Sequence, residues 1–136
     1  MTVRAKGNGK AILCVDDEVI GLSIREMLLE SRGYRVFTAE NGPDALVLLS
    51  SEAIDLVILD YLMPGMNGDV LALKIRELRP DLPLIMLSAY VDLPGEALTA
   101  VNKSLTKGEA TVVLLEAIEE LLGILHAPRS RAVSVE

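Results

Sequence analysis

The sequence predicts a doubly wound α/β fold, in which a five-stranded parallel sheet carries helices on both faces. Three observations support this prediction. Three runs of consecutive apolar residues have the length of strands that are buried on both faces of a parallel sheet. Segments with the apolar spacing of amphipathic helices separate these runs. Two short segments of mixed polarity supply two more strands, so that strand and helix alternate five times along the chain.

The five expected strands are, in chain order, residues 12–15, 34–38, 56–59, 84–87 and 104–106. The first, third and fourth are apolar throughout, which favours central positions in the sheet. The second and fifth contain polar residues and are expected at the two edges. Right-handed crossovers between parallel strands then give the order 2-1-3-4-5, which is the flavodoxin-like arrangement.

Helices are expected between these strands, and in three of them the apolar residues fall on one face. Those faces are formed by Ile20, Ile24, Met27 and Leu28, by Leu71, Ile75 and Leu78, and by Leu114, Ile118, Leu121, Leu122 and Leu125. Acidic residues, including Glu119, lie opposite the last of these faces. Asn41-Gly42-Pro43 opens a helix over residues 45–49, because proline suits a first helical turn. A short helix is expected over residues 92–100, where an aspartate and a proline are start signals.

Length and composition limit the protein to one domain with a buried core. The chain has 136 residues, of which 51% are hydrophobic and 24% charged, a balance that is typical of a globular domain. The alternating elements occupy residues 11–125, between a flexible N-terminal arm (residues 1–10) and a flexible C-terminal tail (residues 126–136). No apolar run approaches the ~18–20 residues of a membrane span, and no signal peptide precedes the domain. A cytoplasmic protein without a membrane partner is therefore expected.

The charge distribution argues against direct nucleic-acid binding. The net charge is −7, but five of the 13 basic residues and only one of the 20 acidic residues lie outside residues 11–125. The domain itself therefore carries −11, which opposes contact with phosphates. The one cysteine, Cys14, cannot form an internal disulfide, and its place within an apolar strand indicates a core residue.

The strongest functional signal is the set of residues that follow the strands. Asp16-Asp17-Glu18 follows the first strand, Asp60 the third, Ser88 the fourth and Lys107 the fifth. In a doubly wound sheet, ligands bind at the edge where the carboxyl ends of the strands lie. Three carboxylates, a hydroxyl and an ammonium group should therefore converge at this edge.

Converging carboxylates require a cation. Two carboxylates about 4 Å apart repel each other by ~4 kcal/mol at an effective dielectric constant of ~20. Mg²⁺ suits such a site, because it binds one or two carboxylates and completes its shell with water and phosphate oxygens. Asp60 can then act as a carboxylate nucleophile that accepts a phosphoryl group. Lys107 and the cation would stabilise the phosphoryl oxygens, and Ser88 would donate a hydrogen bond to them.

Taken singly, these residues have simpler explanations. The acidic cluster at residues 16–18 could favour a helix start through the macrodipole, and Lys107 could be a solvated surface charge. Asp60 could be a turn residue, although a carboxylate that ends an apolar strand is costly without a partner. His126 begins the tail and is expected to be a surface residue rather than a phosphodonor. Only the combination at one sheet edge predicts a site.

The motifs around these residues resemble those of response regulator receiver domains of two-component systems. The resemblance covers residues 11–125 and rests on four segments: Val15-Asp16-Asp17-Glu18, Leu59-Asp60-Tyr61-Leu62-Met63-Pro64-Gly65-Met66-Asn67-Gly68, Leu87-Ser88-Ala89 and Leu105-Thr106-Lys107. It implies a bacterial phosphoacceptor whose Asp60 receives a phosphoryl group from a sensor histidine kinase or a phosphotransfer protein. Such a protein catalyses only its own phosphorylation and dephosphorylation.

The resemblance also implies a role for each site residue. Lys107 would contact the phosphoryl group, and Ser88 would be the hydroxyl of the conformational switch. The implied Mg²⁺ ligands are Asp17, Asp60, the backbone carbonyl of Leu62 and, mostly through water, Asp16.

The sequence departs from the family pattern near the fifth strand. Gly108 stands where the family commonly has a proline, and a trans Lys107–Gly108 bond is expected because a cis non-proline bond costs ~2.5–4 kcal/mol. Ser104 replaces the aromatic residue of the family's switch, and Tyr90 is a candidate substitute. Leu62 and Tyr90 are expected beside the phosphorylated carboxylate, where their bulk would exclude water and prolong the acyl phosphate.

The resemblance covers the whole predicted domain and includes no output domain. A stand-alone receiver is therefore expected. Phosphorylation would change a surface that a kinase, a separate effector or a second copy of the chain recognises. A fragment of a longer regulator would show the same pattern.

The alternative is a receiver-like interaction module that is not phosphorylated, which Ser104 and Gly108 favour. A phosphatase with an Asp-x-Asp nucleophile would need an acid in place of Leu62, and a flavin carrier would need aromatic walls.

Overall fold

The strand order of the sheet confirms the predicted topology. A computed structural model describes residues 7–89 and 93–124 of the chain. Within these ranges, a five-stranded parallel sheet has the order β2-β1-β3-β4-β5. The strands are Ala11–Val15 (β1), Arg35–Ala39 (β2), Leu56–Asp60 (β3), Leu84–Ser88 (β4) and Lys103–Thr106 (β5). The α-helices are Val19–Ser31 (α1), Gly42–Ser51 (α2), Gly68–Leu78 (α3) and Thr111–Leu122 (α4).

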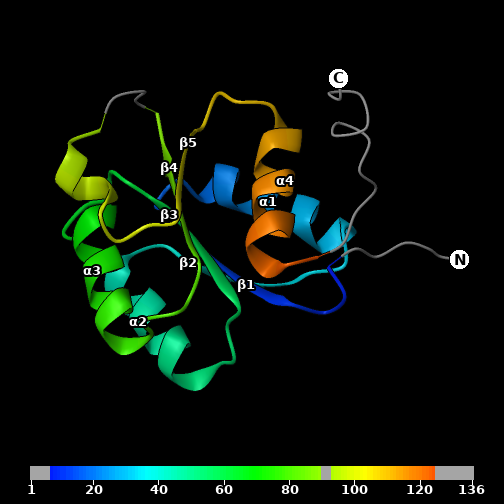
Figure 1. The fold of residues 1–136 in the computed structure, drawn as a ribbon, viewed down its shortest axis with the longest axis horizontal. Coiled ribbons are helices and arrows are strands. Elements are labelled where there is room, and N and C mark those ends of the chain that lie inside the picture. Colours follow the sequence, from blue (N-terminus) through cyan, green and yellow to red (C-terminus); the bar gives the residue numbers. More distant parts are fainter. Residues whose placement is uncertain (1–6, 90–92, 125–136) are drawn as a thin grey trace, which may run out of the picture.

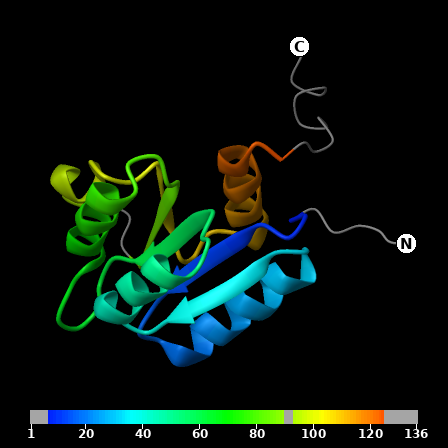
Figure 2. The same cartoon turned by 90° about the horizontal axis from the view of Figure 1, so that it is seen from below.

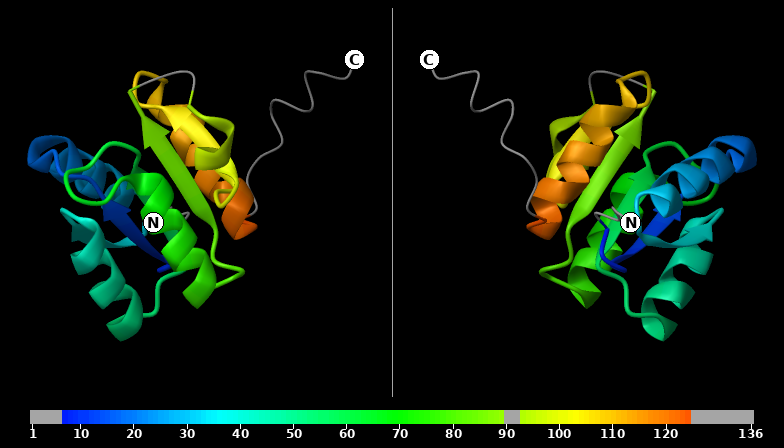
Figure 3. Two further views of the ribbon diagram at one scale, coloured as in Figure 1. Left: turned by 90° about the vertical axis from the view of Figure 1, so that its left-hand side faces the viewer. Right: turned by 90° about the vertical axis from the view of Figure 1, so that its right-hand side faces the viewer.

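Helices cover both faces of the sheet (Figure 1). Helices α1 and α4 pack on one face and α2 and α3 on the other, and Figures 2 and 3 show the same layers from further directions. Successive strand residues point to opposite faces. Ile12 and Cys14 of β1 therefore join the core under α1 and α4, whereas Leu13 and Val15 join the core under α2 and α3.

Helix α1 turns a different face to the sheet from the one that its apolar spacing predicts. Three residues of the predicted face are exposed: Ile20 (78%), Ile24 (62%) and Met27 (70%). Leu22 and Leu29 are buried instead. Arg25 lies on the same stripe, three residues after Leu22 and four before Leu29, and its side chain is only 13% exposed. The prediction was wrong because an arginine interrupts the buried stripe, which left the exposed face the more apolar of the two.

Three details of the other helices also differ from prediction. Leu78 is exposed because it ends α3, and Glu119 of α4 is buried although it was assigned to the solvated face. The helix expected over residues 92–100 is a 3-10 helix, η1 (Gly95–Leu98). Only Ala97 of η1 is buried, which is too little packing to hold a longer helix. The described chain therefore has four α-helices and not five.

Part of the predicted N-terminal arm is hydrogen bonded to the domain. The Gly7 N–H donates to the carbonyl of Arg32 (2.7 Å), and the Gly9 N–H donates to the carbonyl of Gly33 (3.0 Å). A Cβ at Gly7 would overlap Tyr34, so only glycine allows this close contact. Residues 7–10 are thus fixed against the α1–β2 connection. Residues 1–6 and the predicted tail at 126–136 lie outside the described residues.

No helix in the described part of the chain combines the length and the apolar character that crossing a bilayer requires.

Candidate functional site

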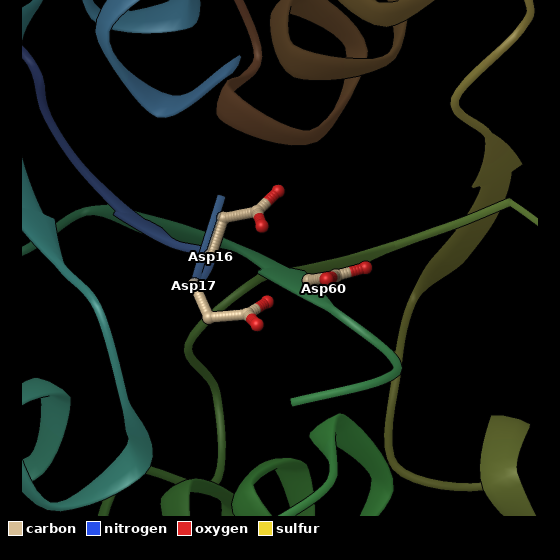
Figure 4. A group of neighbouring side chains, drawn as sticks. All are labelled: Asp16, Asp17 and Asp60. Atoms are coloured by element: carbon tan, nitrogen blue, oxygen red, sulfur yellow. The ribbon is translucent and has the colours of Figure 1, made fainter. Parts of the chain in front are cut away.

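The three predicted carboxylates lie together at the carboxyl end of the sheet (Figure 4). Asp16 and Asp17 follow β1, and Asp60 is the last residue of the adjacent strand β3. One carboxylate oxygen of each residue lies within 4.8 Å of the other two. Asp16 and Asp60 are 1% and 6% exposed, whereas Asp17 is exposed. The cluster therefore joins two buried anions to one that solvent reaches.

Hydrogen bonds hold the chain around the two buried carboxylates in place. The Asp16 N–H donates to the carbonyl of Ala39 (3.1 Å), and Asp16 Oδ1 accepts from the Glu18 N–H (2.9 Å). Beyond the end of β3, the Tyr61 N–H continues the ladder to the carbonyl of Leu87 (2.9 Å). The backbone on both sides of the cluster is thus tied to neighbouring strands, which fixes the direction in which the carboxylates project.

A glycine sets the approach of α3 to Asp60. The Gly68 N–H donates to the carbonyl of Tyr61 (2.6 Å), so α3 begins directly beside the end of β3. A Cβ at residue 68 would overlap the backbone carbonyl oxygen of Asp60. Only glycine lets the helix start so close, and this holds the β3–α3 loop, which carries Leu62, beside the carboxylates.

Lys107 reaches the carboxylates from the end of β5. Its backbone N–H donates to the carbonyl of Ser88 (2.7 Å), which extends the β4–β5 pairing. Its Nζ lies 3.0 Å from Asp16 Oδ2, 3.2 Å from Asp60 Oδ1 and 3.5 Å from Glu18 Oε1. Burial lowers the pKa of Lys107, but its contacts with Asp16 and Asp60 outweigh burial and raise the pKa above 10.5. The ammonium group therefore stays charged at neutral pH.

These side chains surround a cleft of about 270 Å³. The lining consists of Asp17, Glu18, Asp60, Leu62, Ser88, Ala89 and Lys107. Except for Tyr90, which lies outside the described residues, the structure brings together the residues that the sequence assigned to the site. All of them line the cleft but Asp16, which is buried and contacts Lys107. The roles of these residues in binding and transfer stay predictions.

The Asp60 carboxylate is held in an unfavourable electrostatic environment. The pKa of Asp60 is raised from 3.8 to about 6, mainly by burial. The charge of Asp16 and, more weakly, that of Asp17 also raise this pKa, and Lys107 opposes them. Since one ammonium group cannot offset three carboxylates, the metal-free cluster is short of positive charge.

This imbalance predicts that Asp60→Asn stabilises the metal-free protein. A pKa raised by folding means that the charge of Asp60 costs stability as the pH rises from about 4 to about 6. Asp60→Asn removes this cost and should raise the free energy of unfolding by about 1–3 kcal/mol at about pH 8. Urea unfolding in EDTA, followed by circular dichroism, measures the difference. It should shrink at about pH 4, where the aspartate is protonated. A variant no more stable than wild type at the higher pH would contradict the argument.

The donor set fits Mg²⁺. The cluster offers carboxylate oxygens alone, without a cysteine or histidine, and such oxygens with water are the ligands that Mg²⁺ prefers. Asp16 Oδ2 is buried and, among the described residues, forms ion pairs but accepts no hydrogen bond of regular geometry. An additional cation would relieve both this buried charge and the repulsion at Asp60.

Arg25 is a member of the site that the sequence analysis missed. Its Nη1 lies 3.5 Å from Asp16 Oδ2. The sequence did contain a signal, because Arg25 falls at helical spacing from Leu22 and Leu29, both of which are buried. A charged group on a buried stripe requires a partner of opposite charge, and Asp16 is that partner.

The structure also tests the departures from the family pattern. The described residues contain no cis peptide bond, so the Lys107–Gly108 bond is trans, as predicted. Ser104, in place of the family's aromatic residue, is exposed on β5. Tyr90, its candidate substitute, lies outside the described residues.

Fold and site together define a class of proteins: doubly wound α/β domains that gather an acidic cluster and a lysine at the carboxyl edge of a five-stranded parallel sheet. The family model for the response regulator receiver domain matches residues 12–119. The chain belongs to this family, the receiver domains of two-component systems.

Individual relatives agree with this assignment. The transcriptional regulatory protein GlrR of Escherichia coli K12 is 36% identical over 115 residues, which cover 82% of this chain and 26% of GlrR. The chain thus spans about a quarter of that relative's length. Response regulator TrrA of Thermotoga maritima, solved with Mg²⁺ and BeF, is 38% identical with a TM-score of 0.77, covering 83% of this chain and 99% of TrrA.

A third relative is part of a kinase. The receiver domain of sensor histidine kinase PA1611 from Pseudomonas aeruginosa PAO1, solved with a magnesium ion coordinated in the active site cleft, is 27% identical. Its TM-score is 0.77, and the match covers 85% of this chain and 98% of that domain.

Proposed function

We propose that this receiver domain accepts a phosphoryl group on Asp60 in a Mg²⁺-dependent reaction and signals through the resulting change of its surface. One observation carries the proposal: Asp60 Oδ1 lies 3.2 Å from Lys107 Nζ within a cluster of three carboxylates. A carboxylate in this position combines a nucleophilic oxygen with a fixed ammonium group and a place for a divalent cation.

Mg²⁺, when bound, would neutralise the oxygens of the phosphoryl group during its transfer. Asp17, Asp60 and the backbone carbonyl of Leu62 would hold the ion directly, and Asp16 through water. The magnesium reported for TrrA and for the PA1611 domain supports this choice of metal. Because Asp17 is exposed, it would hold the ion where solvent and the incoming donor can reach it.

The transfer itself needs no general base. An oxygen of the ionised Asp60 carboxylate attacks phosphorus and forms a P–O bond, while the bond from phosphorus to the leaving group breaks and the leaving group takes the electron pair. Lys107 donates hydrogen bonds to the phosphoryl oxygens. The Ser88 hydroxyl donates a hydrogen bond to the same group once it is attached. The catalysis is confined to the domain's own phosphorylation and dephosphorylation.

The chemistry of the acceptor indicates the partners. A phosphohistidine carries an activated phosphoryl group, so a sensor histidine kinase or a phosphotransfer protein is the expected donor, in the cytoplasm. The added charge of about −1.5 to −2 would change how the surface binds a target protein or a second copy of the chain.

Labelling with a small phosphodonor tests this function. Acetyl phosphate with Mg²⁺ should produce one hydroxylamine-labile adduct, detected by intact-protein mass spectrometry, and EDTA should prevent it. Absence of an adduct at saturating Mg²⁺ would reject the proposal. That result would favour the receiver-like interaction module. The exposed Ser104, in place of the aromatic residue of the family's switch, supports this alternative.

Leu62 is predicted to protect the acyl phosphate from water. It lines the cleft beside Asp60, and its side chain is 46% exposed. Leu62→Asn replaces an apolar barrier with a group that can orient water, so dephosphorylation should become about fivefold faster, which is about 1 kcal/mol of barrier. The decay of purified phosphoprotein measures the rate. Leu73→Asn, at a similarly exposed position (52%) on α3 outside the cleft lining, is the control and should decay like wild type. An unchanged or slower rate for Leu62→Asn would contradict the prediction.

A further inference from the structure

The buried ion pair between α1 and the acidic cluster has no assigned role in the proposed transfer. Arg25 Nη1 lies 3.5 Å from Asp16 Oδ2, and the two side chains are 13% and 1% exposed. Lys107 Nζ contacts the same oxygen at 3.0 Å. Asp16 therefore has two cationic neighbours at one oxygen, while its other oxygen is occupied by the Glu18 N–H.

Lys107 is shared between two buried carboxylates. It lies almost equally far from Asp16 Oδ2 and from Asp60 Oδ1, at 3.0 and 3.2 Å. The proposed transfer requires Lys107 to move from these carboxylates to phosphoryl oxygens. If Lys107 were the sole counter-charge of Asp16, this move would leave a buried carboxylate without a partner, which is strongly unfavourable.

Arg25 removes this conflict. Its guanidinium is permanently charged and approaches Asp16 from α1, whereas Lys107 approaches from β5. Asp16 therefore keeps a counter-charge when Lys107 leaves. Arg25 also alters the charge of the loaded site. With Glu18 included, the four carboxylates, Lys107, Arg25 and one Mg²⁺ are together neutral. Arg25 thus cancels a negative charge that would otherwise repel an anionic donor.

We propose that Arg25 is a positioning residue that neutralises buried Asp16 and thereby releases Lys107 to the phosphoryl group, at the cost of weaker Mg²⁺ binding. The part that concerns Lys107 rests on the proposed function. The part that concerns Mg²⁺ does not, because cation binding can be measured without a phosphodonor. Opposite effects on the two measurements are the signature of this role, since a merely structural residue would weaken both or neither.

Arg25→Met tests the proposal, because methionine keeps the length and helix propensity of arginine and removes the charge. By calorimetry, Mg²⁺ should bind about tenfold more tightly, since one nearby positive charge is gone. The acetyl phosphate labelling rate at saturating Mg²⁺ should fall about tenfold, because Asp16 retains Lys107. Arg25→Lys should restore both values toward wild type. Arg32→Met, which removes an exposed charge at the end of the same helix, is the matched control and should change neither by more than about twofold.

The same substitution in the Asp16→Asn variant makes the test specific. In Asp16→Asn, residue 16 has no carboxylate that could retain Lys107, so adding Arg25→Met should not slow labelling further. An Mg²⁺ affinity within about twofold of wild type in Arg25→Met, or the same rate loss in both backgrounds, would overturn the proposal. Arg25→Gln gives the same comparison if Arg25→Met does not fold. If wild-type protein takes no phosphoryl group, the proposed function fails, and the calorimetry alone decides the electrostatic role of Arg25.

Discussion

Asp60→Asn lowers the rate of phosphoryl labelling by at least about 100-fold. An amide oxygen lacks the negative charge that makes the Asp60 carboxylate a nucleophile, and the ion pair with Lys107 is lost with that charge. Loss of folding cannot explain the result, because the metal-free variant is expected to be more stable than wild type. A time course with acetyl phosphate and Mg²⁺, followed by intact-protein mass spectrometry, measures the effect.

The matched control for this prediction is Asp81→Asn. It makes the same chemical change at an exposed residue that precedes β4, at the amino end of the sheet. Its labelling rate should equal that of wild type. Labelling of Asp60→Asn at a rate near that of wild type would mean that another group is the acceptor, and the proposed mechanism would be wrong.

Asp17→Asn lowers the affinity for Mg²⁺ by at least about tenfold. Asp17 is the exposed member of the cluster, and its loss removes one proposed charged ligand while Asp16 and Asp60 are unchanged. The repulsion of ~4 kcal/mol between neighbouring carboxylates sets the scale of the attraction that a divalent ion would lose. Isothermal titration calorimetry without phosphodonor measures the affinity directly.

The labelling rate then separates weaker Mg²⁺ binding from a change in the placement of Asp60 and Lys107. At low Mg²⁺, Asp17→Asn should label more slowly than wild type, and raising the Mg²⁺ concentration should recover much of the rate, because Asp60 and Lys107 are unchanged. Asp81→Asn again serves as the control and should bind Mg²⁺ like wild type. An unaltered Mg²⁺ affinity in Asp17→Asn would show that the cation binds elsewhere.

The sheet was predictable because burial of its central strands leaves a direct trace in the sequence. The runs 12–15, 56–59 and 84–87 are apolar throughout, and they are the three central strands β1, β3 and β4. Once their positions are known, the handedness of parallel crossovers fixes the remaining order. The edge strands followed from their polar residues, and all five strands were found within one residue of their predicted bounds.

Helix orientation was less predictable, because apolar spacing does not say which of two faces meets the sheet. On α1 the more apolar face, with Ile20 and Met27, is exposed, and the stripe that contains Arg25 is buried. The length of η1 could not be predicted either. Start signals at residues 92–94 specify where a helix can begin, but its length depends on the packing that follows.

In the candidate site, too, the residues placed by strand order were predictable, and the residue placed by helix packing was not. Parallel strands bring Asp16, Asp17, Asp60 and Lys107 to one edge, so their proximity followed from strand order alone. Arg25 comes from a helix and reaches the site only because α1 packs with that face inward. Its contribution depends on a tertiary contact and could be recognised only as a charge that interrupts a buried stripe.

The location of a bound divalent ion tests the central claim most directly. Crystals grown with Mn²⁺ in place of Mg²⁺ give an anomalous signal that identifies the ion and its ligands. We expect a single ion in the cleft, bound by carboxylate oxygens of Asp17 and Asp60 and by the carbonyl of Leu62, with Asp16 linked through water. An empty cleft at saturating Mn²⁺, or an Asp60 side chain that points away from the ion, would contradict the account.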